Sequence, residues 1–327
     1  MDTFKGFNAL LYSNDRPFED IAIPLFQYQA LHNPIYNQYI KNLAIEIKKI
    51  DSLEKIPYMP ISFFKSNVIK TGNWSDEVGF ASSGTTGTIT SKHYLPDLKF
   101  YLDHAERCFS YFFGDLTNYH FLAFLPSYQE RGNSSLIAMM NSFITKSDSP
   151  HSGFYLQNED KLLADLEILR RQNKKVILWG VSFALLELAE KYQPDLSHCL
   201  IFETGGMKGR RKEITRKELH SLLQKGLNVD LIYSEYGMTE LLSQAYSKGD
   251  FFECPPYMKI MARDVTDPFK IGLIEETGAL NIIDLANHHS VAFIETEDIG
   301  KVFQNGSFEV LGRMDNSEIR GCNLLIQ

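Results

Sequence analysis

The 327-residue sequence is poor in cysteine, with four that lie far apart: Cys108, Cys199, Cys254 and Cys322. None belongs to a Cys-x-x-Cys pair or lies near a histidine at metal-ligand spacing, which argues against a structural zinc site. The N-terminus also lacks the basic and apolar segments of a signal peptide. Isolated thiols without a leader are typical of a reducing compartment, so we expect a cytoplasmic protein.

Long apolar runs and an excess of basic residues are also lacking. No uninterrupted apolar stretch approaches the roughly 20 residues that span a bilayer, so we expect no membrane span. The formal net charge is −8. Because nucleic-acid surfaces rely on Lys and Arg to neutralise phosphates, we expect no nucleic-acid partner. With 44% hydrophobic residues, the chain is expected to fold around a sizeable core.

The middle of the chain alternates short apolar stretches with amphipathic ones. Strands are predicted at 121–125, 175–179, 200–202 and 229–233, and helices at 97–112, 160–171, 183–192 and 212–224. Asp97 is a suitable N-cap for the first of these helices. Such alternation predicts an α/β fold with a parallel sheet and flanking helices, in which the loops after the carboxyl ends of the strands bind ligands.

The two ends of the chain differ from this middle part. Residues 1–70 carry apolar positions at helical spacing and form a predicted N-terminal helical section. Residues 266–327 are rich in short strands and turns and form a predicted β-rich lobe. No linker rich in Gly, Ser or Pro separates the sections. We therefore expect a single domain, 1–327, in which these two sub-lobes flank an α/β core at 71–265.

Two turns in the C-terminal lobe predict β-hairpins. Thr277-Gly278 separates the apolar stretches 271–274 and 280–283, and Asn305-Gly306 separates 301–303 from 308–310. Dipeptides that end in Gly are suited to the tight turns that join antiparallel strands. The two stretches on either side of each turn are therefore predicted to form an antiparallel hairpin.

Small, hydroxylated and glycine residues gather from Ala81 to His93. Within this stretch, the backbone and side chains of Ser82, Ser83, Gly84, Thr85, Thr86 and Gly87 offer donors to a polyanion, and Lys92 adds a cation. The spacing differs from the common P-loop, in which Lys directly follows the second Gly of the motif. The stretch is a candidate phosphate cradle, with a plain solvated loop as the alternative.

Two predicted strand ends carry unusual residues. Glu203-Thr204-Gly205-Gly206 precedes a run of Lys and Arg, and the Gly pair would let a ligand approach the backbone. A tight turn with solvated cations is the alternative there. Tyr236-Gly237-Met238-Thr239-Glu240 combines a ring, a hydroxyl and a carboxylate, which suit a base, a phosphate and Mg²⁺. In the C-terminal lobe, Asp298 can accept from both hydroxyls of a ribose and Arg313 can hold a hydroxyl or a phosphate, although Asp-x-Gly is also a common turn.

The order of these motifs resembles the adenylate-forming superfamily, which includes acyl-CoA synthetases, luciferases and non-ribosomal adenylation domains. Ser82–Gly87 resembles its phosphate loop, Tyr236–Glu240 its aromatic-Gly-x-Thr-Glu motif, Asp298 its ribose-binding Asp, and Gly312-Arg313-Met314-Asp315 its hinge motif. The resemblance implies the α/β fold of the large N-terminal-type domain of these enzymes. It also implies activation of a carboxylic acid with ATP and Mg²⁺.

Within the superfamily, three segments are most similar to the acyl-protein synthetases of bacterial luminescence: 56–65, 203–209 and 318–322. By resemblance, such ligases activate a fatty acid, hold it as a thioester and deliver it to an acyl reductase.

The resemblance also implies roles for single residues. It places Thr85, Thr86 and Lys92 at the phosphates, Thr239 at the α-phosphate, Glu240 at Mg²⁺, Tyr236 at adenine, and Asp298 and Arg313 at ribose. Cys322 would carry the acyl group. Gly205 and Gly206 are pocket candidates by location, as are Trp179, Gly180 and Val181.

Several alternatives stay open. The superfamily usually carries a small C-terminal domain after the hinge, with a Lys that contacts the reacting groups, and this sequence stops soon after Asp315. Lys92, Lys208 or a partner subunit is expected to take the role of that Lys. The acyl acceptor is Cys322, CoA or a partner protein. An acyl- or aryl-CoA ligase of the phenylacetate type is an alternative function, and so is an inactive nucleotide-binding partner subunit.

Overall fold

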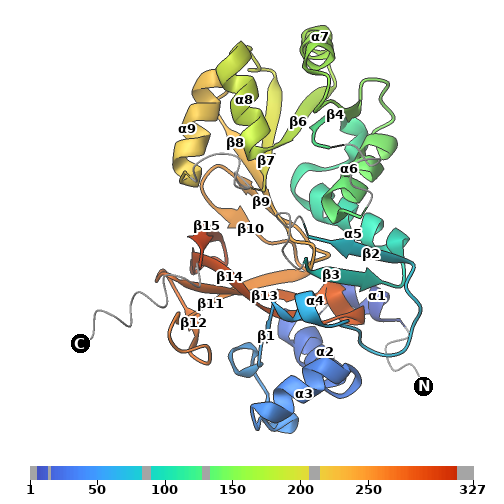
Figure 1. Ribbon diagram of the computed structural model, residues 1–327, viewed down its shortest axis with the longest axis vertical. Helices are drawn as coiled ribbons and strands as arrows, with labels where there is room; N and C mark the ends of the chain where they lie inside the picture. Colours follow the sequence, from blue (N-terminus) through green and yellow to red (C-terminus); the bar gives the residue numbers. More distant parts are fainter. Residues whose placement is uncertain (1–5, 14–15, 83–89, 127–132, 206–213, 315–327) are drawn as a thin grey trace. The chain divides into compact units, whose positions relative to one another are not determined.

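The structure is a computed structural model that describes residues 6–13, 16–82, 90–126, 133–205 and 214–314 (Figure 1). Its contacts divide the chain into two compact units. One consists of residues 1–73 and 256–327, and the other of residues 74–255. The division of a single adenylation domain into the three predicted sub-lobes stays a prediction.

The unit of residues 74–255 is built on a mostly parallel sheet. Its strands run in the order β10-β9-β8-β7-β6-β4-β5. The strands are β4 (Tyr119–Phe124), β5 (Gly153–Phe154), β6 (Lys175–Val181), β7 (Cys199–Thr204), β8 (Ile232–Tyr236), β9 (Ala245–Lys248) and β10 (Phe252–Glu253). Strands β4 to β8 pair in parallel, and β9 and β10 continue the sheet antiparallel. The predicted α/β class with a parallel sheet is confirmed.

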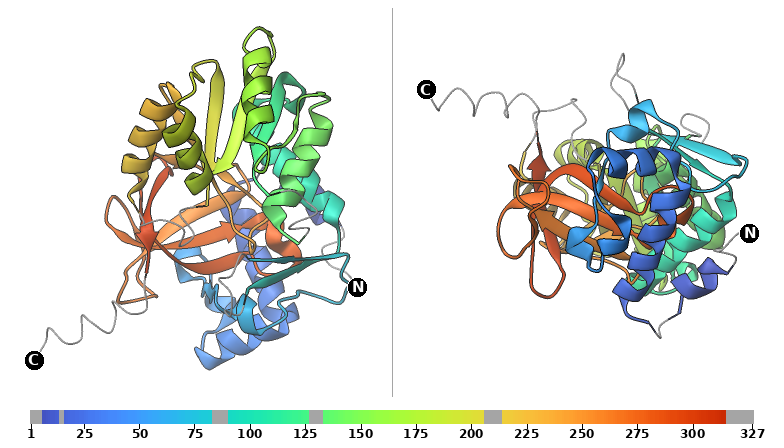
Figure 2. Two further views of the ribbon diagram at one scale, coloured as in Figure 1. Left: turned by 45° about the horizontal axis from the view of Figure 1, so that its top comes forward. Right: turned by 90° about the horizontal axis from the view of Figure 1, so that it is seen from below.

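Helices cover both faces of this sheet. They are α5 (Leu98–Phe113), α6 (Ser135–Lys146), α7 (Glu159–Leu169), α8 (Ser182–Tyr192) and α9 (Arg216–Leu227), with the 3₁₀ turn η3 (Leu116–Asn118). Helices α8 and α9 lie on one face, and α5 and α6 on the other (Figures 1 and 2). The side chain of Asp97 accepts a hydrogen bond from the Phe100 N–H at the start of α5, so the predicted N-cap is confirmed.

An aromatic core fills the face under α5 and α6. Phe109 of α5 lies 5.6 Å from Phe121, 6.4 Å from Trp179 and 6.4 Å from Phe202, measured between ring centroids. Trp179 stacks on Phe202 at 4.6 Å, and Phe202 on Tyr233 at 5.0 Å. Trp179, Phe202 and Tyr233 are partners in the sheet register, so their side chains lie on the same face and form one row across β6, β7 and β8.

The other unit combines the first and last parts of the chain. Its helices and turns are α1 (Phe7–Leu11), α2 (Phe18–His32), α3 (Pro34–Asn42), α4 (Phe63–Ser66), η1 (Ile47–Lys49), η2 (Leu53–Lys55) and η4 (Leu285–His289). Its strands are β1 (Met59–Pro60), β11 (Met258–Arg263), β12 (Ile271–Leu273), β13 (Gly278–Asp284), β14 (Phe293–Val302) and β15 (Phe308–Arg313). The order β12-β11-β13-β14-β15 is antiparallel, and β1 pairs in parallel with β14.

A buried amide joins these two distant parts of the chain. Gln29 of α2 is fully buried, and its Nε2 donates to the Asn287 carbonyl at 2.9 Å. Its Oε1 accepts from the Ala292 N–H at 2.9 Å. Phe26, on the same helix, contacts Phe293 of β14 at a centroid distance of 5.9 Å. Helix α2 is therefore held against residues that lie some 260 positions later in the sequence.

The unit of residues 74–255 also contains a small antiparallel ribbon of two strands. Strands β2 (Val78–Ala81) and β3 (Lys92–Leu95) pair with each other and lead into and out of the stretch that is rich in Gly, Ser and Thr. Across the described ranges, no helix combines the length and apolar character that a membrane crossing requires.

One of the two predicted hairpins is wrong. Strand β12 does not pair with β13, because β11 lies between them and pairs with both. The Thr-Gly turn therefore joins strands that are not neighbours in the sheet. The second hairpin is confirmed: β14 and β15 pair antiparallel, and Gly306 has a φ of +82°, which glycine adopts readily.

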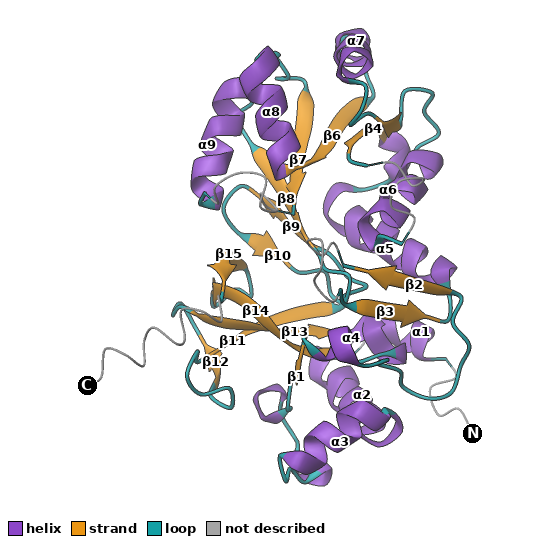
Figure 3. Ribbon diagram, in the orientation of Figure 1, coloured by secondary structure: helices purple, strands orange, loops and turns teal. Residues whose placement is uncertain are grey.

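Asn33 divides the predicted N-terminal helical section into α2 and α3, which lie side by side (Figure 3). Its Oδ1 accepts from the Tyr36 N–H at 3.0 Å, and Pro34 occupies the first helical position. Its Nδ2 donates to the Ser290 carbonyl at 3.0 Å and to Thr71 Oγ1 at 3.3 Å. The fully buried Asn33 therefore both caps a helix and links it to η4.

Replacing Asn33 with alanine is expected to lower the free energy of unfolding by about 2 to 3 kcal/mol, because the cap and the donor to a buried carbonyl are lost together. Urea denaturation measures the change. Asp97→Ala is the matched control, since Asp97 is an exposed cap and its loss should cost only about 1 kcal/mol. Equal losses in the two variants would contradict the bridging role of Asn33.

Candidate functional site

The carboxyl ends of β6, β7 and β8 lie at one edge of the sheet, since the three strands are parallel neighbours. Gly205 directly follows β7 and has a φ of +78°, a conformation that favours glycine. Tyr236 is the last residue of β8, and Gly237 to Glu240 follow it. The structure therefore brings the two predicted strand-end motifs to the same edge.

The base of the Gly/Ser/Thr stretch is closed by backbone pairing. Ala81 and Lys92 are partners at the ends of β2 and β3. Beyond them, the Ser82 N–H donates to the Ser91 carbonyl and Ser82 Oγ accepts from the Ser91 N–H, both at 3.0 Å. Lys92 is exposed. The predicted phosphate-binding residues Ser83, Gly84, Thr85, Thr86 and Gly87 lie outside the described residues.

His93 connects the strand after this stretch to the Tyr236–Glu240 motif. It is fully buried, and its Nδ1 lies 2.9 Å from the Thr239 carbonyl oxygen. Burial lowers the pKa of His93 to about 4, against the opposing effect of that hydrogen bond. The ring is therefore neutral near pH 7, and its Nδ1–H donates to Thr239. This hydrogen bond holds β3, which follows the Gly/Ser/Thr stretch, next to the Tyr236–Glu240 motif. Both the stretch and the motif are predicted to bind phosphates.

A second buried histidine holds the residues that follow the motif. His104 of α5 places its Nε2 2.8 Å from Ser243 Oγ and 3.5 Å from the Cys108 sulfur. Burial lowers the pKa of His104 to about 3, and the nearby charge of Arg107 acts in the same direction. Helix α5 therefore anchors the chain just beyond Glu240 through a neutral imidazole.

Glu240, the predicted Mg²⁺ ligand, is buried. Its side chain is only 5% exposed, at the end of the motif. Among the residues that the structure describes, no three or more His, Cys, Asp or Glu form a metal-binding group. Mg²⁺ in nucleotide sites takes one or two carboxylates together with phosphate oxygens and water. The predicted contact of Glu240 with Mg²⁺ stays a prediction.

The ring of Tyr236 is largely buried. It is 9% exposed and lies 5.7 Å from the ring of Phe252, measured between centroids. Phe252 belongs to β10, so Tyr236 is supported from within the same unit. Its predicted contact with adenine stays a prediction.

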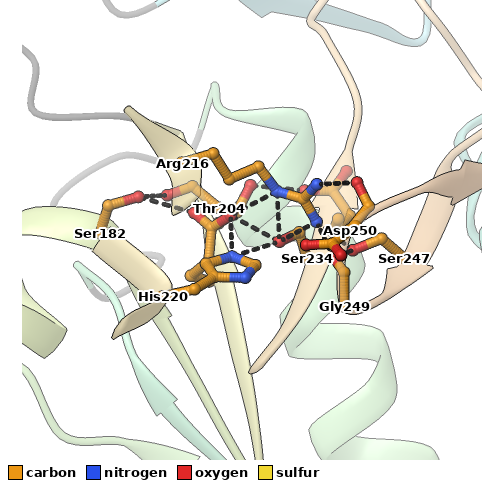
Figure 4. Close-up of polar contacts among 10 residues, drawn as sticks. Ser182, Thr204, Arg216, His220, Ser234, Ser247, Gly249 and Asp250 are labelled. Carbon is orange, nitrogen blue, oxygen red and sulfur yellow. Dashed lines mark hydrogen bonds and ion pairs between the residues drawn. The ribbon is translucent and has the colours of Figure 1, made fainter. Parts of the chain in front are cut away.

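Ser182, Ser234, His220 and Arg216 lie close together near the end of β7 (Figure 4). Their shared partner is the buried carboxylate of Glu203. Glu203 Oε2 accepts from Ser182 Oγ at 2.8 Å, and Oε1 accepts from Ser234 Oγ at 2.6 Å. His220 Nε2 lies 3.5 Å and Arg216 Nε 3.7 Å from Oε1. Burial raises the pKa of Glu203, but hydrogen bonds from His220, Ser234 and Ser182 outweigh it and lower the pKa overall. Glu203 is therefore ionised near neutral pH.

The opposite face of β7 and β8 carries a second link. Thr204 Oγ1 donates to Glu235 Oε2 at 2.6 Å. A Cβ atom at Gly237 would lie 2.2 Å from Glu235 Oε1, so the glycine makes room for this carboxylate. Side chains therefore tie β7 to β8 on both faces of the sheet, immediately before the motif.

The predicted ribose residues lie in the other unit, and the structure brings them together. Asp298 and Arg313 are partners on β14 and β15. Arg313 Nε lies 3.0 Å from Asp298 Oδ1. The Asp298 carboxylate is buried, whereas the Arg313 side chain is exposed.

Other predicted residues lie in the core or outside the described residues. Trp179 is fully buried in the aromatic core, and a Cβ atom at Gly180 would lie 2.8 Å from Leu185, so neither has open space beside it. Gly206, Lys208 and Cys322 lie outside the described residues, and their predicted roles stay predictions.

No family model and no curated protein matches the sequence. Among solved structures, ATP-bound MatB from Rhodopseudomonas palustris is similar, with a TM-score of 0.54 and 16% identity over 74% of this chain and 49% of MatB. A 2-hydroxyisobutyryl-CoA ligase in the postadenylation state with 2-HIB-AMP has a TM-score of 0.69 and 11% identity, over 91% of this chain and 67% of the ligase.

This chain shares the α/β fold of both neighbours, with a C-terminal β-rich region. The predicted fold class is therefore confirmed. The chain spans about half the length of MatB.

Proposed function

We propose that this protein uses ATP to activate a carboxylic acid as its acyl-adenylate. The hydrogen bond from His93 to the Thr239 carbonyl carries the proposal. It joins the strand that follows the Gly/Ser/Thr stretch to the motif that ends in Glu240, within one unit. The fold shared with adenylate-forming ligases supports the same chemistry.

In the proposed reaction, a carboxylate oxygen of the acid attacks the α-phosphorus of ATP, and the bond to pyrophosphate breaks. A carboxylate is ionised at neutral pH, so the protein needs no general base and acts by positioning and charge stabilisation. Mg²⁺, when bound, supplies positive charge at the phosphates.

Residue roles follow from the motifs. Thr85, Thr86 and Lys92 bind the phosphates, Thr239 the α-phosphate, Glu240 Mg²⁺, Tyr236 adenine, and Asp298 and Arg313 ribose. Two neutral histidines, His93 and His104, hold the motif in place without adding charge to it.

The proposed substrate is a fatty acid and the proposed class an acyl-protein synthetase, on the resemblance of segments 56–65, 203–209 and 318–322. The thiolate of Cys322 attacks the carbonyl carbon of the adenylate, a C–S bond forms, and AMP leaves. An acyl reductase then takes the acyl group. CoA is the second candidate acceptor, because one structural neighbour is a CoA ligase.

ATP–pyrophosphate exchange across fatty, aryl and amino acids tests the proposed activity. We expect exchange that depends on an added fatty acid. Strict dependence of AMP formation on CoA would instead select a CoA ligase. ATP binding without exchange for every acid would indicate an inactive nucleotide-binding subunit.

The acyl-carrying role of Cys322 predicts a covalent adduct. After incubation with ATP, Mg²⁺ and fatty acid, intact mass should rise by one acyl group, and hydroxylamine should remove it. The adduct should disappear in Cys322→Ser. It should persist in Cys254→Ser, which removes a partly exposed thiol elsewhere. An adduct that survives in Cys322→Ser would exclude this cysteine as the carrier.

A further inference from the structure

We infer that Glu203 is a positioning residue, whose buried charge sets the geometry of the strand ends that carry Thr204 and the Tyr236–Glu240 motif. The inference rests on the proposed function for its kinetic consequence. Its structural consequence can be measured without any activity.

The donors around Glu203 come from three separate parts of this unit. Ser182 directly follows β6, Ser234 lies on β8, and Arg216 and His220 lie on α9. Glu203 is only 7% exposed. Since a charge removed from water is costly unless it is paired and hydrogen-bonded, each element is held where its donor can reach the carboxylate.

Arg216 extends this network to the strands beyond β8. Its Nη2 donates to Ser234 Oγ at 2.9 Å and to the Gly249 carbonyl at 2.7 Å, and also to Ser247 Oγ. Its Nη1 donates to the Asp250 carbonyl at 2.7 Å (Figure 4). The start of α9 is thus fixed to β8, β9 and the turn after β9.

The same guanidinium also supports the ring that is proposed to contact adenine. Arg216 Cζ lies 4.3 Å from the centroid of the Phe252 ring, within the range of a cation–π interaction. Phe252 in turn contacts Tyr236 at 5.7 Å. A chain of contacts therefore runs from Glu203 through Arg216 and Phe252 to Tyr236.

A second chain of contacts runs through the backbone of β7. Glu203 pairs with Ser234 in the sheet register, and on the other face Thr204 donates to Glu235. Glu235 packs against Gly237. Any shift of β7 relative to β8 would therefore move the start of the motif.

Stability alone is a poor explanation for such a network. Replacing a buried ion pair with apolar residues is often neutral or stabilising, because desolvation offsets the attraction between the charges. The charge instead fixes the orientation of the surrounding side chains, since each donor must point at the carboxylate. The network is therefore better suited to fixing geometry than to adding free energy.

Glu203→Gln tests the inference, because it keeps the side-chain size and removes the charge. We expect kcat for pyrophosphate exchange to fall about tenfold or more, with KM for ATP changed less than about threefold, since misplaced reacting groups lower the rate of the chemical step. Backbone amides of residues 232–240 should also exchange hydrogen faster.

Glu295→Gln is the matched control. Glu295 pairs with the buried Arg263 at 3.2 Å in the other unit. The Glu295→Gln substitution should lower thermal stability. It should change neither kcat per folded molecule nor the protection of the backbone amides of residues 232–240 against hydrogen exchange. Ser182→Ala removes one donor and keeps the charge, so it should shift the same two readouts by less and remain measurable if Glu203→Gln fails to fold.

Two outcomes would overturn the inference. One is a Glu203→Gln protein that loses thermal stability but keeps wild-type kcat and wild-type protection at 232–240. The other, if Glu203→Gln fails to fold, is a Ser182→Ala protein that shows no change in either readout. If the wild type shows no exchange with any acid, the proposed function fails, and amide protection alone decides the role of Glu203.

Discussion

Glu240→Gln is expected to lower ATP–pyrophosphate exchange about a thousandfold. The substitution keeps the shape of a side chain that is 5% exposed and removes the charge proposed to bind Mg²⁺. Removing one charge-stabilising group from a site that excludes water costs about 100-fold to 1,000-fold in rate, and loss of the metal adds to that. Exchange at saturating acid, with ATP and Mg²⁺ varied, measures the effect.

A binding measurement separates loss of metal from loss of fold. We expect ATP with Mg²⁺ to raise the melting temperature of the wild type, since a ligand that binds only the native state stabilises it. Glu240→Gln should lose most of that increase while its melting temperature without ligand stays close to wild type. Glu253→Gln, an exposed carboxylate of the same unit, should behave as the wild type. Exchange that persists in Glu240→Gln would remove the metal assignment.

Acidification is expected to destabilise the protein through His93 and His104. Both are fully buried, and burial lowers their pKa values to about 4 and about 3. Between those values and about pH 6.5, the unfolded chain binds protons that the folded chain does not, so stability rises with pH and falls on acidification. The free energy of unfolding should drop by roughly 4 kcal/mol from pH 7 to pH 5 through these two groups.

Urea denaturation at pH 7, 6 and 5 measures this slope. In His93→Gln, one of the two groups is removed, and the amide can still donate to the Thr239 carbonyl. The variant should therefore lose about half of the pH dependence attributed to the two histidines. A slope equal to that of the wild type would show that His93 does not carry the effect.

The parts of the fold that depend on local sequence were predictable. Helix α5 begins at the Asp97 cap, and the parallel strands β4, β6, β7 and β8 overlap the predicted apolar stretches. These features are decided within a few residues, by hydrogen bonds of a cap or by an apolar run between turns. The Asn305-Gly306 hairpin is local in the same sense.

Pairings between distant segments were not predictable. The Thr277-Gly278 turn looks like a hairpin, yet β11 takes both neighbouring strands as partners. The division between α2 and α3 depends on Asn33, whose partners include Ser290. A turn or a helix cap can be predicted from adjacent residues. Which distant strand or loop then pairs with that segment cannot be predicted in this way.

The candidate site divides in the same way. The motif at Tyr236–Glu240, and Asp298 and Arg313, could be proposed as site residues from the sequence, because their residue types suit nucleotide binding. His93 and Glu203 belong to stretches that stand out in the sequence, but their own roles were not predictable, because what distinguishes these two residues is burial next to partners from other elements. A charged residue at the end of an apolar strand, as at Glu203, was the only indication in the sequence.

The bonds of Gln29 have a consequence for the order in which the protein folds as it is made. Residues 74–255 form a continuous stretch, so that unit has all its internal contacts once residue 255 has left the ribosome. The partner of Gln29, Asn287, is synthesised 258 residues later. At the usual 5 to 20 residues per second, helix α2 spends roughly 13 to 50 seconds without its partners. Helix α2 is therefore made long before the residues that it packs against, and its apolar face stays uncovered by them in the meantime.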